Sequence, residues 1–233
     1  MLTTILVIVV VSGALIAGAA WGIYGNLPKS IEGFMVAFAG GALMVSAILE
    51  LIDPAAKRSP MPWVLLFVFI GAAVFCILDY FVKQKWGSDN GGGLLAAITL
   101  DGIPENLALG VALIGAEPLA VAALSGSILL SNLPEAAGGA KEMSKNKKST
   151  GRIMWLWIGT AIILSLAALA GNLLLKEAPD ETLDYIRCFA AGAVIASLAI
   201  EVFPKAYKED YYWAGIATAL GVIVAIFLNS LGN

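Results

Sequence analysis

The amino-acid sequence predicts an all-α polytopic membrane protein with eight transmembrane helices. Hydrophobic residues occupy 60% of the 233 positions, and only 13% are charged, whereas about a quarter of an average soluble domain is charged. The first charged residue is Lys29, so the chain begins with an uninterrupted apolar run. A helix needs roughly 20 apolar residues to cross the hydrocarbon core of a bilayer, and eight such runs follow one another along the chain.

Short polar interruptions separate these runs and leave no room for a soluble domain. Residues 1–233 are therefore expected to form a single transmembrane domain. Its helices are expected at residues 2–21, 31–52, 62–82, 93–114, 119–140, 153–174, 185–203 and 212–229. The first run has an alternative reading as a signal peptide, because small residues at 17–20 offer a cleavage site. It lacks the positively charged start of such a peptide.

The distribution of Lys and Arg predicts the orientation, because these residues are concentrated in cytoplasmic loops. One side of the predicted membrane domain carries Lys29, Lys83, Lys85, Lys141, Lys145, Lys147, Lys148, Arg152, Lys205 and Lys208. The other side carries only Lys57, Arg58, Lys176 and Arg187. This bias predicts that both termini lie outside and that residues 141–152 form a basic cytoplasmic loop. We interpret that loop as a topology anchor and expect no nucleic-acid partner.

Two internal repeats relate spans that run in opposite directions. Residues 37–57 are similar to residues 188–208, and the alignment brings Glu50 together with Glu201. The segment DGIPENLALG in the fourth span is similar to SNLPEAAGGA in the fifth. This pattern predicts an inverted repeat of three spans, a central pair and three spans, a plan that transporters commonly use. Chance similarity between apolar segments is the alternative.

Acidic residues within the expected spans are candidates for function, because ionisable groups at membrane depth are costly. They are Glu50, Asp79, Asp101, Glu105, Glu135 and Glu201. For Glu50 and Asp79, a position near the membrane interface is enough to explain why an ionisable residue occurs within the span. Glu105 and Glu135 lie mid-span and directly follow a proline, so they are the stronger candidates.

The two prolines, Pro104 and Pro134, predict helix kinks. A proline has no backbone N–H, so the carbonyls of Leu100 and Leu130, four residues earlier, lose their helical partners. In lipid such groups must be satisfied by a neighbour, water or an ion. Each of the two helices is therefore expected to contain a kink, a carbonyl without its helical hydrogen bond and an adjacent carboxylate.

Further oxygen atoms share the faces of these glutamates. Asp101 precedes Glu105 by one helical turn, and Ser131 and Asn132 precede Glu135 by four and three residues. Two bare carboxylates would repel each other, and a divalent cation removes that penalty. The pattern therefore favours a divalent-metal site. A proton relay and a buried polar seam that fixes helix register are the alternatives.

The two Pro-Glu segments resemble the paired His-Asn-x-Pro-Glu-Gly motifs on helices 4 and 5 of the ZIP (Zrt/Irt-like protein) family of divalent metal transporters. ELIDPA and EVFPKA, at the ends of the second and seventh spans, are also like that family. The resemblance covers nearly the full chain. It implies transport of a Zn, Fe or Mn class cation toward the cytoplasm, across a plasma membrane or a prokaryotic inner membrane. Dimers are common in such proteins, so a homodimer is an expectation from the resemblance alone.

The resemblance also implies roles for individual residues. Asp101 stands at the position of the helix 4 histidine, Glu105 at that of the bridging glutamate, and Glu135 at that of the second glutamate. Ser131 and Asn132 occupy the helix 5 positions that usually hold His, Gln, Asn or Asp. Among the remaining acids, Glu50 is expected at the outer entrance, and Asp79 and Glu201 at the inner exit.

The chain departs from the family pattern in ways that affect the choice of ion. It contains no histidine, and the sixth span contains no acid, so the sequence predicts a divergent relative with a single site. Oxygen ligands suit hard cations such as Mg, Ca and Mn, whereas imidazole suits Zn. The alternative is a repurposed relative with a non-zinc substrate or a metal-sensing or regulatory role. No Ser-His, Cys-His or phosphate-binding motif is present, so an enzyme is not expected.

Overall fold

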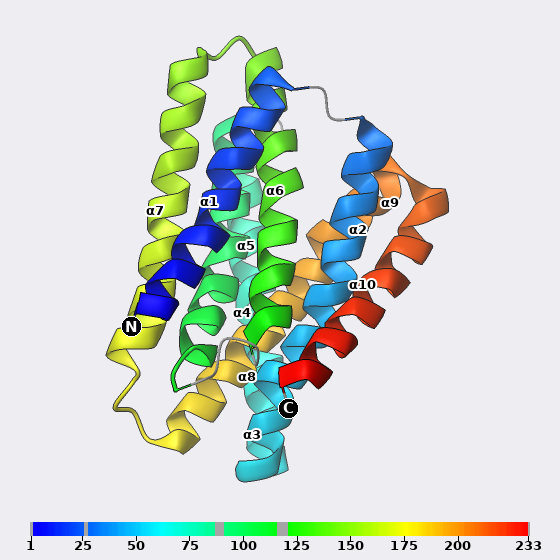
Figure 1. Ribbon diagram of the computed structural model, residues 1–233. Helices are drawn as coiled ribbons and strands as arrows, with labels where there is room; N and C mark the ends of the chain where they lie inside the picture. The colour runs from blue at the N-terminus through cyan, green and yellow to red at the C-terminus, as the bar shows by residue number, and fades with distance from the viewer. Residues whose placement is uncertain (1, 26–27, 87–90, 116–120, 233) are drawn as a thin grey trace.

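The computed structural model describes residues 2–25, 28–86, 91–115 and 121–232, and within these ranges the regular structure is entirely helical. The elements follow one another up and down a single bundle (Figure 1). They are α1 (Leu2–Tyr24), α2 (Lys29–Ser46), η1 (Ala47–Ile52), α3 (Asp53–Arg58), α4 (Met61–Trp86), α5 (Gly91–Ala112), α6 (Ala122–Lys145), α7 (Thr150–Leu174), α8 (Asp180–Ser197), η3 (Leu198–Val202), α9 (Phe203–Glu209) and α10 (Tyr211–Gly232).

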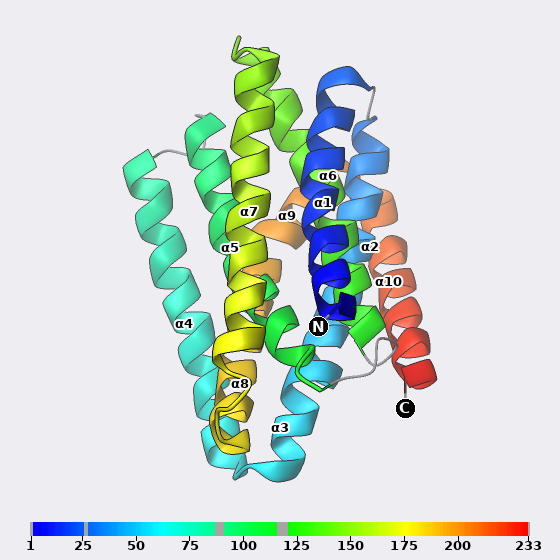
Figure 2. The same ribbon diagram turned by 60° about the vertical axis from the view of Figure 1, so that its left-hand side comes forward.

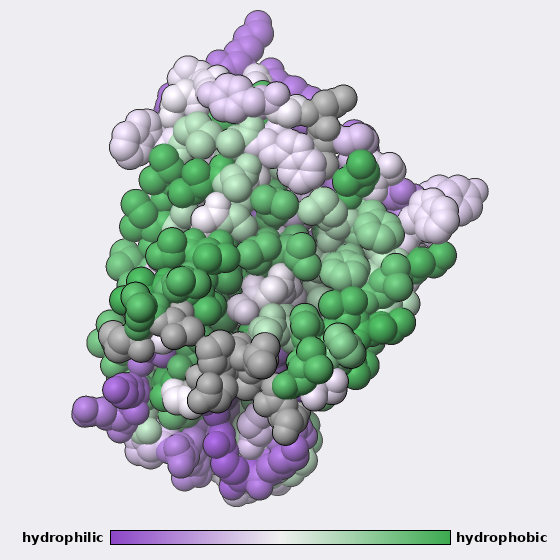
Figure 3. Space-filling view, in the orientation of Figure 1, coloured by the Kyte–Doolittle hydropathy of each residue, from purple (hydrophilic) through white to green (hydrophobic). Residues whose placement is uncertain are grey.

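The apolar outer surface is compatible with a multi-pass membrane protein. Among the described residues, six helical segments are long and apolar enough to cross a membrane: 4–24, 29–58, 61–84, 150–174, 180–209 and 211–231. α5 and α6, which carry the Pro-Glu motifs, are not among these six. Large hydrophobic side chains on α4 and α10, including Phe69 and Phe227, are exposed. Figure 3 shows a hydrophobic band around the middle of the molecule and hydrophilic residues toward both ends.

Two of the long segments contain a π-helical turn before a proline. η1 joins α2 to α3, with Pro54 in the first turn of α3, and η3 joins α8 to α9, with Pro204 in the first turn of α9. Proline is tolerated at a helix start, and a π-bulge adjusts the preceding hydrogen bonds. η1 and η3 begin 151 residues apart, which is also the offset between the two similar sequences.

Small residues allow the helices to approach closely. α1 packs against α6, α5 against α7, α2 against α10, and α4 against α8. A Cβ atom added to Gly41 of α2 would collide with the carbonyl oxygen of Thr218 on α10. A Cβ atom added to Gly192 of α8 would collide in the same way with the carbonyl oxygen of Val68 on α4. Such contacts between small residues are typical of helices that pack within a membrane.

Both termini lie at one end of the bundle, which we call the terminal end (Figure 1). The connection between α6 and α7 lies at the other end, which we call the basic end. The expected basic loop at 141–152 is only partly a loop, because α6 continues through Lys145 and α7 begins at Thr150. Residues 146–149 alone connect the two helices. Figure 2 shows α4 and α10 at opposite edges of the bundle.

Gly192→Ala should lower the free energy of unfolding by about 1–3 kcal/mol, because the added methyl group meets the backbone of α4 and cannot be accommodated by a side-chain rotation. Reversible unfolding in mixed micelles, followed by circular dichroism, measures the change. The matched control is Gly215→Ala on α10, where a Cβ atom meets nothing within 4 Å. That substitution should be neutral or stabilising by up to about 1 kcal/mol. Equal stability of the two variants would contradict the close approach of α8 and α4.

Candidate functional site

The acidic residues of the two Pro-Glu motifs lie in the interior of the bundle. Asp101 and Glu105 of α5 are 7% and 5% exposed, and Glu135 of α6 is half-buried. α5 and α6 are contacting neighbours, and each contains its motif proline within the helix. Glu135 lies close enough to interact electrostatically with both Asp101 and Glu105. The fold therefore brings three of the predicted carboxylates into one region.

This region extends toward the predicted exit. Asp101 also interacts electrostatically with Asp79 of α4 and Glu201 of η3, and Glu135 interacts with Glu201. These acids come from four elements, α4, α5, α6 and η3. Within the described residues, however, no group of three or more His, Cys, Asp or Glu side chains lies close enough to hold a metal ion. The carboxylates interact without being gathered around one point.

Two buried oxygen atoms of α5 have no hydrogen-bond partner among the described residues: Oδ1 of Asp101 and Oδ1 of Asn106. Asn106 is completely buried, and its Nδ2 donates a hydrogen bond of 2.9 Å to the carbonyl of Gly102. An unsatisfied buried polar atom in a native structure calls for an explanation, such as an ion or a water molecule. The sequence interpretation did not include Asn106, although an amide directly after Glu105 was a usable signal.

The two predicted polar residues of α6 are buried and hydrogen-bonded to backbone. Ser131 Oγ donates to the carbonyl of Ile128 at 3.1 Å, within its own helix. Asn132 Nδ2 donates to the carbonyl of Val11 on α1 at 3.3 Å. Asn132 therefore ties α6 to α1. Its hydrogen bond uses the amide nitrogen, whereas a metal would be bound by the amide oxygen.

The two predicted exit residues, Asp79 and Glu201, share one lysine. Lys83 Nζ lies 2.9 Å from Asp79 Oδ2 and also forms an ion pair with Glu201. Asp79 is 5% exposed, and its Oδ1 has no hydrogen-bond partner among the described residues. The sequence analysis counted Lys83 only as a charge for orientation. Its position one helical turn after Asp79 was the available signal for the pair.

The predicted entrance residue, Glu50, lies away from these acids, in η1. Its Oε1 accepts a hydrogen bond of 2.9 Å from the backbone N–H of Leu124 on α6. Glu50 lines a cavity of about 240 Å³ together with Arg58, Arg187 and Asn229. Arg58 ends α3 and Asn229 lies in the last turn of α10, near the C-terminus, so this cavity is at the terminal end. Glu50 is thus placed at a mouth of the bundle opposite the basic end.

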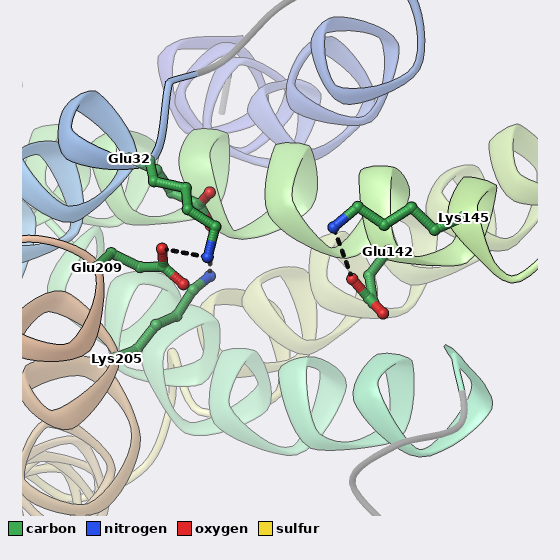
Figure 4. Close-up of polar contacts among 6 residues, drawn as sticks. Glu32, Glu142, Lys145, Lys205 and Glu209 are labelled. Atoms are coloured by element: carbon green, nitrogen blue, oxygen red, sulfur yellow. Dashed lines mark hydrogen bonds and ion pairs between the residues drawn. The ribbon is translucent and has the colours of Figure 1, made fainter.

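Ion pairs join separate elements at the basic end (Figure 4). Glu32 of α2, which is 7% exposed, pairs with Lys205 of α9 at 3.2 Å. Lys29 pairs with Glu209 at 3.0 Å, again between α2 and α9. Lys205 also interacts electrostatically with Glu135. The sequence analysis did not predict these pairs, because nothing in the local pattern relates residues so far apart in the chain.

No protein-family model matches the sequence, and no curated protein matches it. The resemblance described above therefore depends on the motif residues alone.

Proposed function

We propose that the chain is a membrane transporter that moves a divalent metal cation past a carboxylate-lined site on α5 and α6. The observation that carries the proposal is the burial of Asp101 and Glu105 on a helix that has no basic residue. A buried charge without a counter-charge is far more costly than a compensated one. A divalent cation would compensate these carboxylates, and the unsatisfied Oδ1 atoms of Asp101 and Asn106 are oxygen ligands of the kind that hard cations prefer.

The proposed membrane arrangement has eight spans, with α5 and α6 as the fourth and fifth. These two polar helices are packed against α1, α2, α7 and α8, whose apolar residues would separate them from lipid. Both termini would lie outside, and the basic end would face the cytoplasm, as the Lys and Arg bias indicates. The chain would then follow the plan of the ZIP transporters that its motifs resemble.

We also propose that the eight spans form an inverted repeat of three spans, a central pair and three spans. Exchange of α1 with α7, α2 with α8, α4 with α10, and α5 with α6 converts each major packing pair into another one. The α1–α6 pair becomes α7–α5, the α2–α10 pair becomes α8–α4, and the α2–α6 pair becomes α8–α5. The equivalent π-helical turns η1 and η3 add support. Inverted repeats allow one half to rock against the other, which provides alternating access.

In the proposed mechanism the metal ion is the substrate, and the side chains act as successive ligands. Glu50, on the cavity at the terminal end, gathers the ion. Asp101, Glu105 and Glu135 hold it at the centre, with oxygen atoms from Asn106 and the α6 amide and hydroxyl as further ligands. Asp79 and Glu201 receive it on the way to the basic end. The π-helical turns that carry Glu50 and Glu201 are local departures from α-helical hydrogen bonding, and such turns occur frequently at functional sites.

Glu105→Gln and Glu135→Gln should each reduce Mn²⁺ uptake into proteoliposomes at least about tenfold, because each removes a charged ligand while preserving the shape of the side chain. Uptake is measured as a function of Mn²⁺ concentration, and bound Mn²⁺ is measured on the same purified proteins. Glu177→Gln, at an exposed glutamate beyond α7, is the matched control and should transport normally. Unchanged uptake in the two variants would contradict the proposed site. Binding without any flux in the native chain would favour a sensing role instead.

Asp101→His should shift the metal preference toward Zn²⁺ by about tenfold relative to Mn²⁺, equivalent to about 1.4 kcal/mol of binding free energy. The reason is that imidazole suits Zn²⁺ better than a carboxylate does. Competition between Zn²⁺ and Mn²⁺ for the purified protein measures the ratio. Asp180→His, at an exposed position in the first turn of α8, controls for non-specific binding by an added histidine. An unchanged ratio would show that Asp101 is not a ligand.

A further inference from the structure

A cavity lined by charged side chains lies at the basic end, among α2, α6 and α9. Its volume is about 190 Å³, and three glutamates line it together with Lys29, Lys141, Lys145 and Lys205. Figure 4 shows the Glu142–Lys145 pair of α6 apart from the ion pairs that join α2 to α9. The cavity has room for several water molecules, and therefore for one phosphate group.

Two glycines of α6 shape the wall of this cavity. Gly138 and Gly139 both line it. A Cβ atom added to Gly138 would collide with Oε1 of Glu32 and would lie 3.4 Å from Nζ of Lys205. The lack of a side chain at Gly138 therefore allows the Glu32–Lys205 pair to lie directly against α6.

Positive side chains outnumber negative ones around the cavity. It is lined by four lysines and three glutamates, and each glutamate forms an ion pair with one of these lysines. The adjoining residues 143–152 add Lys147, Lys148 and Arg152 and contain no acidic residue. Like charges so close together repel each other, and a bound anion would reduce that repulsion.

Exposed aromatic side chains lie at the same end of the bundle. They are Trp155 near the start of α7, Tyr207 of α9 and Tyr212 of α10. Trp and Tyr are enriched where a membrane protein meets the lipid headgroups. In the proposed membrane arrangement the cavity therefore lies at the depth of the headgroups, where the phosphate of a lipid is the nearest source of negative charge.

We propose that this cavity binds the headgroup of an anionic phospholipid, with the phosphate among the four lysines. Basic pockets between membrane helices on the cytoplasmic side bind phosphate-bearing headgroups in this way. The bound headgroup would connect α6 with α2 and α9, because the lysines come from all three elements. The inference rests on the proposed membrane arrangement and does not depend on the proposed metal substrate.

Lipid binding to the full chain in detergent micelles, measured by native mass spectrometry, tests the site. Anionic phosphatidylglycerol should bind at least about tenfold more tightly than zwitterionic phosphatidylcholine. Lys141→Gln combined with Lys145→Gln should weaken phosphatidylglycerol binding at least about fivefold, because two of the four lysines lose their charge. The matched control combines Lys57→Gln with Lys176→Gln, which removes the same charge at exposed positions of the terminal end and should leave binding unchanged.

Three results would overturn the proposal. The first is equal affinity for the two lipids. The second is an equal loss of affinity in the two double variants, which would indicate a general effect of net charge. The third is displacement of the lipid by millimolar inorganic phosphate, which would indicate a site for free phosphate instead of a headgroup.

A second measurement uses the native chain in lipid nanodiscs, in case the lysine variants do not fold. Reductive methylation of Lys145, quantified by mass spectrometry, should be several-fold slower in phosphatidylglycerol than in phosphatidylcholine, because the headgroup covers the ammonium group. Lys57, at the terminal end, should react at the same rate in both. An unchanged rate at Lys145 would overturn the proposal. Failure of the chain to enter a phosphatidylcholine bilayer would contradict the membrane arrangement, and the proposal with it.

Discussion

The cost of holding a carboxylate away from water without a counter-charge governs the polar interior of this bundle. Most of its buried acids have a basic partner. Asp184, which is completely buried, pairs with Arg58 and accepts a hydrogen bond from Ser59, and Glu32 pairs with Lys205. Asp101 and Glu105 are different, because neither forms an ion pair within the described residues. The chain therefore compensates Asp184 and Glu32 with its own cations, and under the proposed function a cation from outside would compensate the central pair.

Prolines determine where the backbone can contribute to these sites. Pro104 and Pro134 lie inside α5 and α6, and the carboxylate that follows each one is presented where the helical hydrogen-bond pattern is broken. Pro54 and Pro204 instead begin short helices directly after a π-helical turn. Proline thus interrupts the helical hydrogen-bond pattern within α5 and α6, and it follows the π-helical turns that contain Glu50 and Glu201.

Hydropathy located eight helical segments, and six of these are, within the described residues, long and apolar enough to cross a membrane. That α5 and α6 also span it stays a prediction. Hydropathy did not predict where a helix begins when its first turns contain a buried charge that is paired with another helix. The seventh span was expected to begin at residue 185, but α8 begins at Asp180 and includes the buried Asp184. Its partner Arg58 comes from another helix, and local sequence contains no sign of such a long-range pair. Asp101 and Glu105 are buried, and their role as metal ligands stays a prediction. The sequence prediction of the site did not include Asn106 or Lys83. The position of each of these side chains depends on which face of its helix turns inward.

Positive side chains accompany the acids along most of the proposed path, and this constrains how an ion could move. Arg58 and Arg187 line the cavity of Glu50, Lys205 interacts with Glu135, and Lys83 holds Asp79 and Glu201. On the proposed path, a divalent cation would compete with Lys83 at Asp79 and Glu201, whereas at Asp101 and Glu105, which form no ion pair within the described residues, it would be the main counter-charge. In the proposed mechanism the ion would therefore be bound most strongly at the centre and more weakly beside the internal cations, which would allow its release.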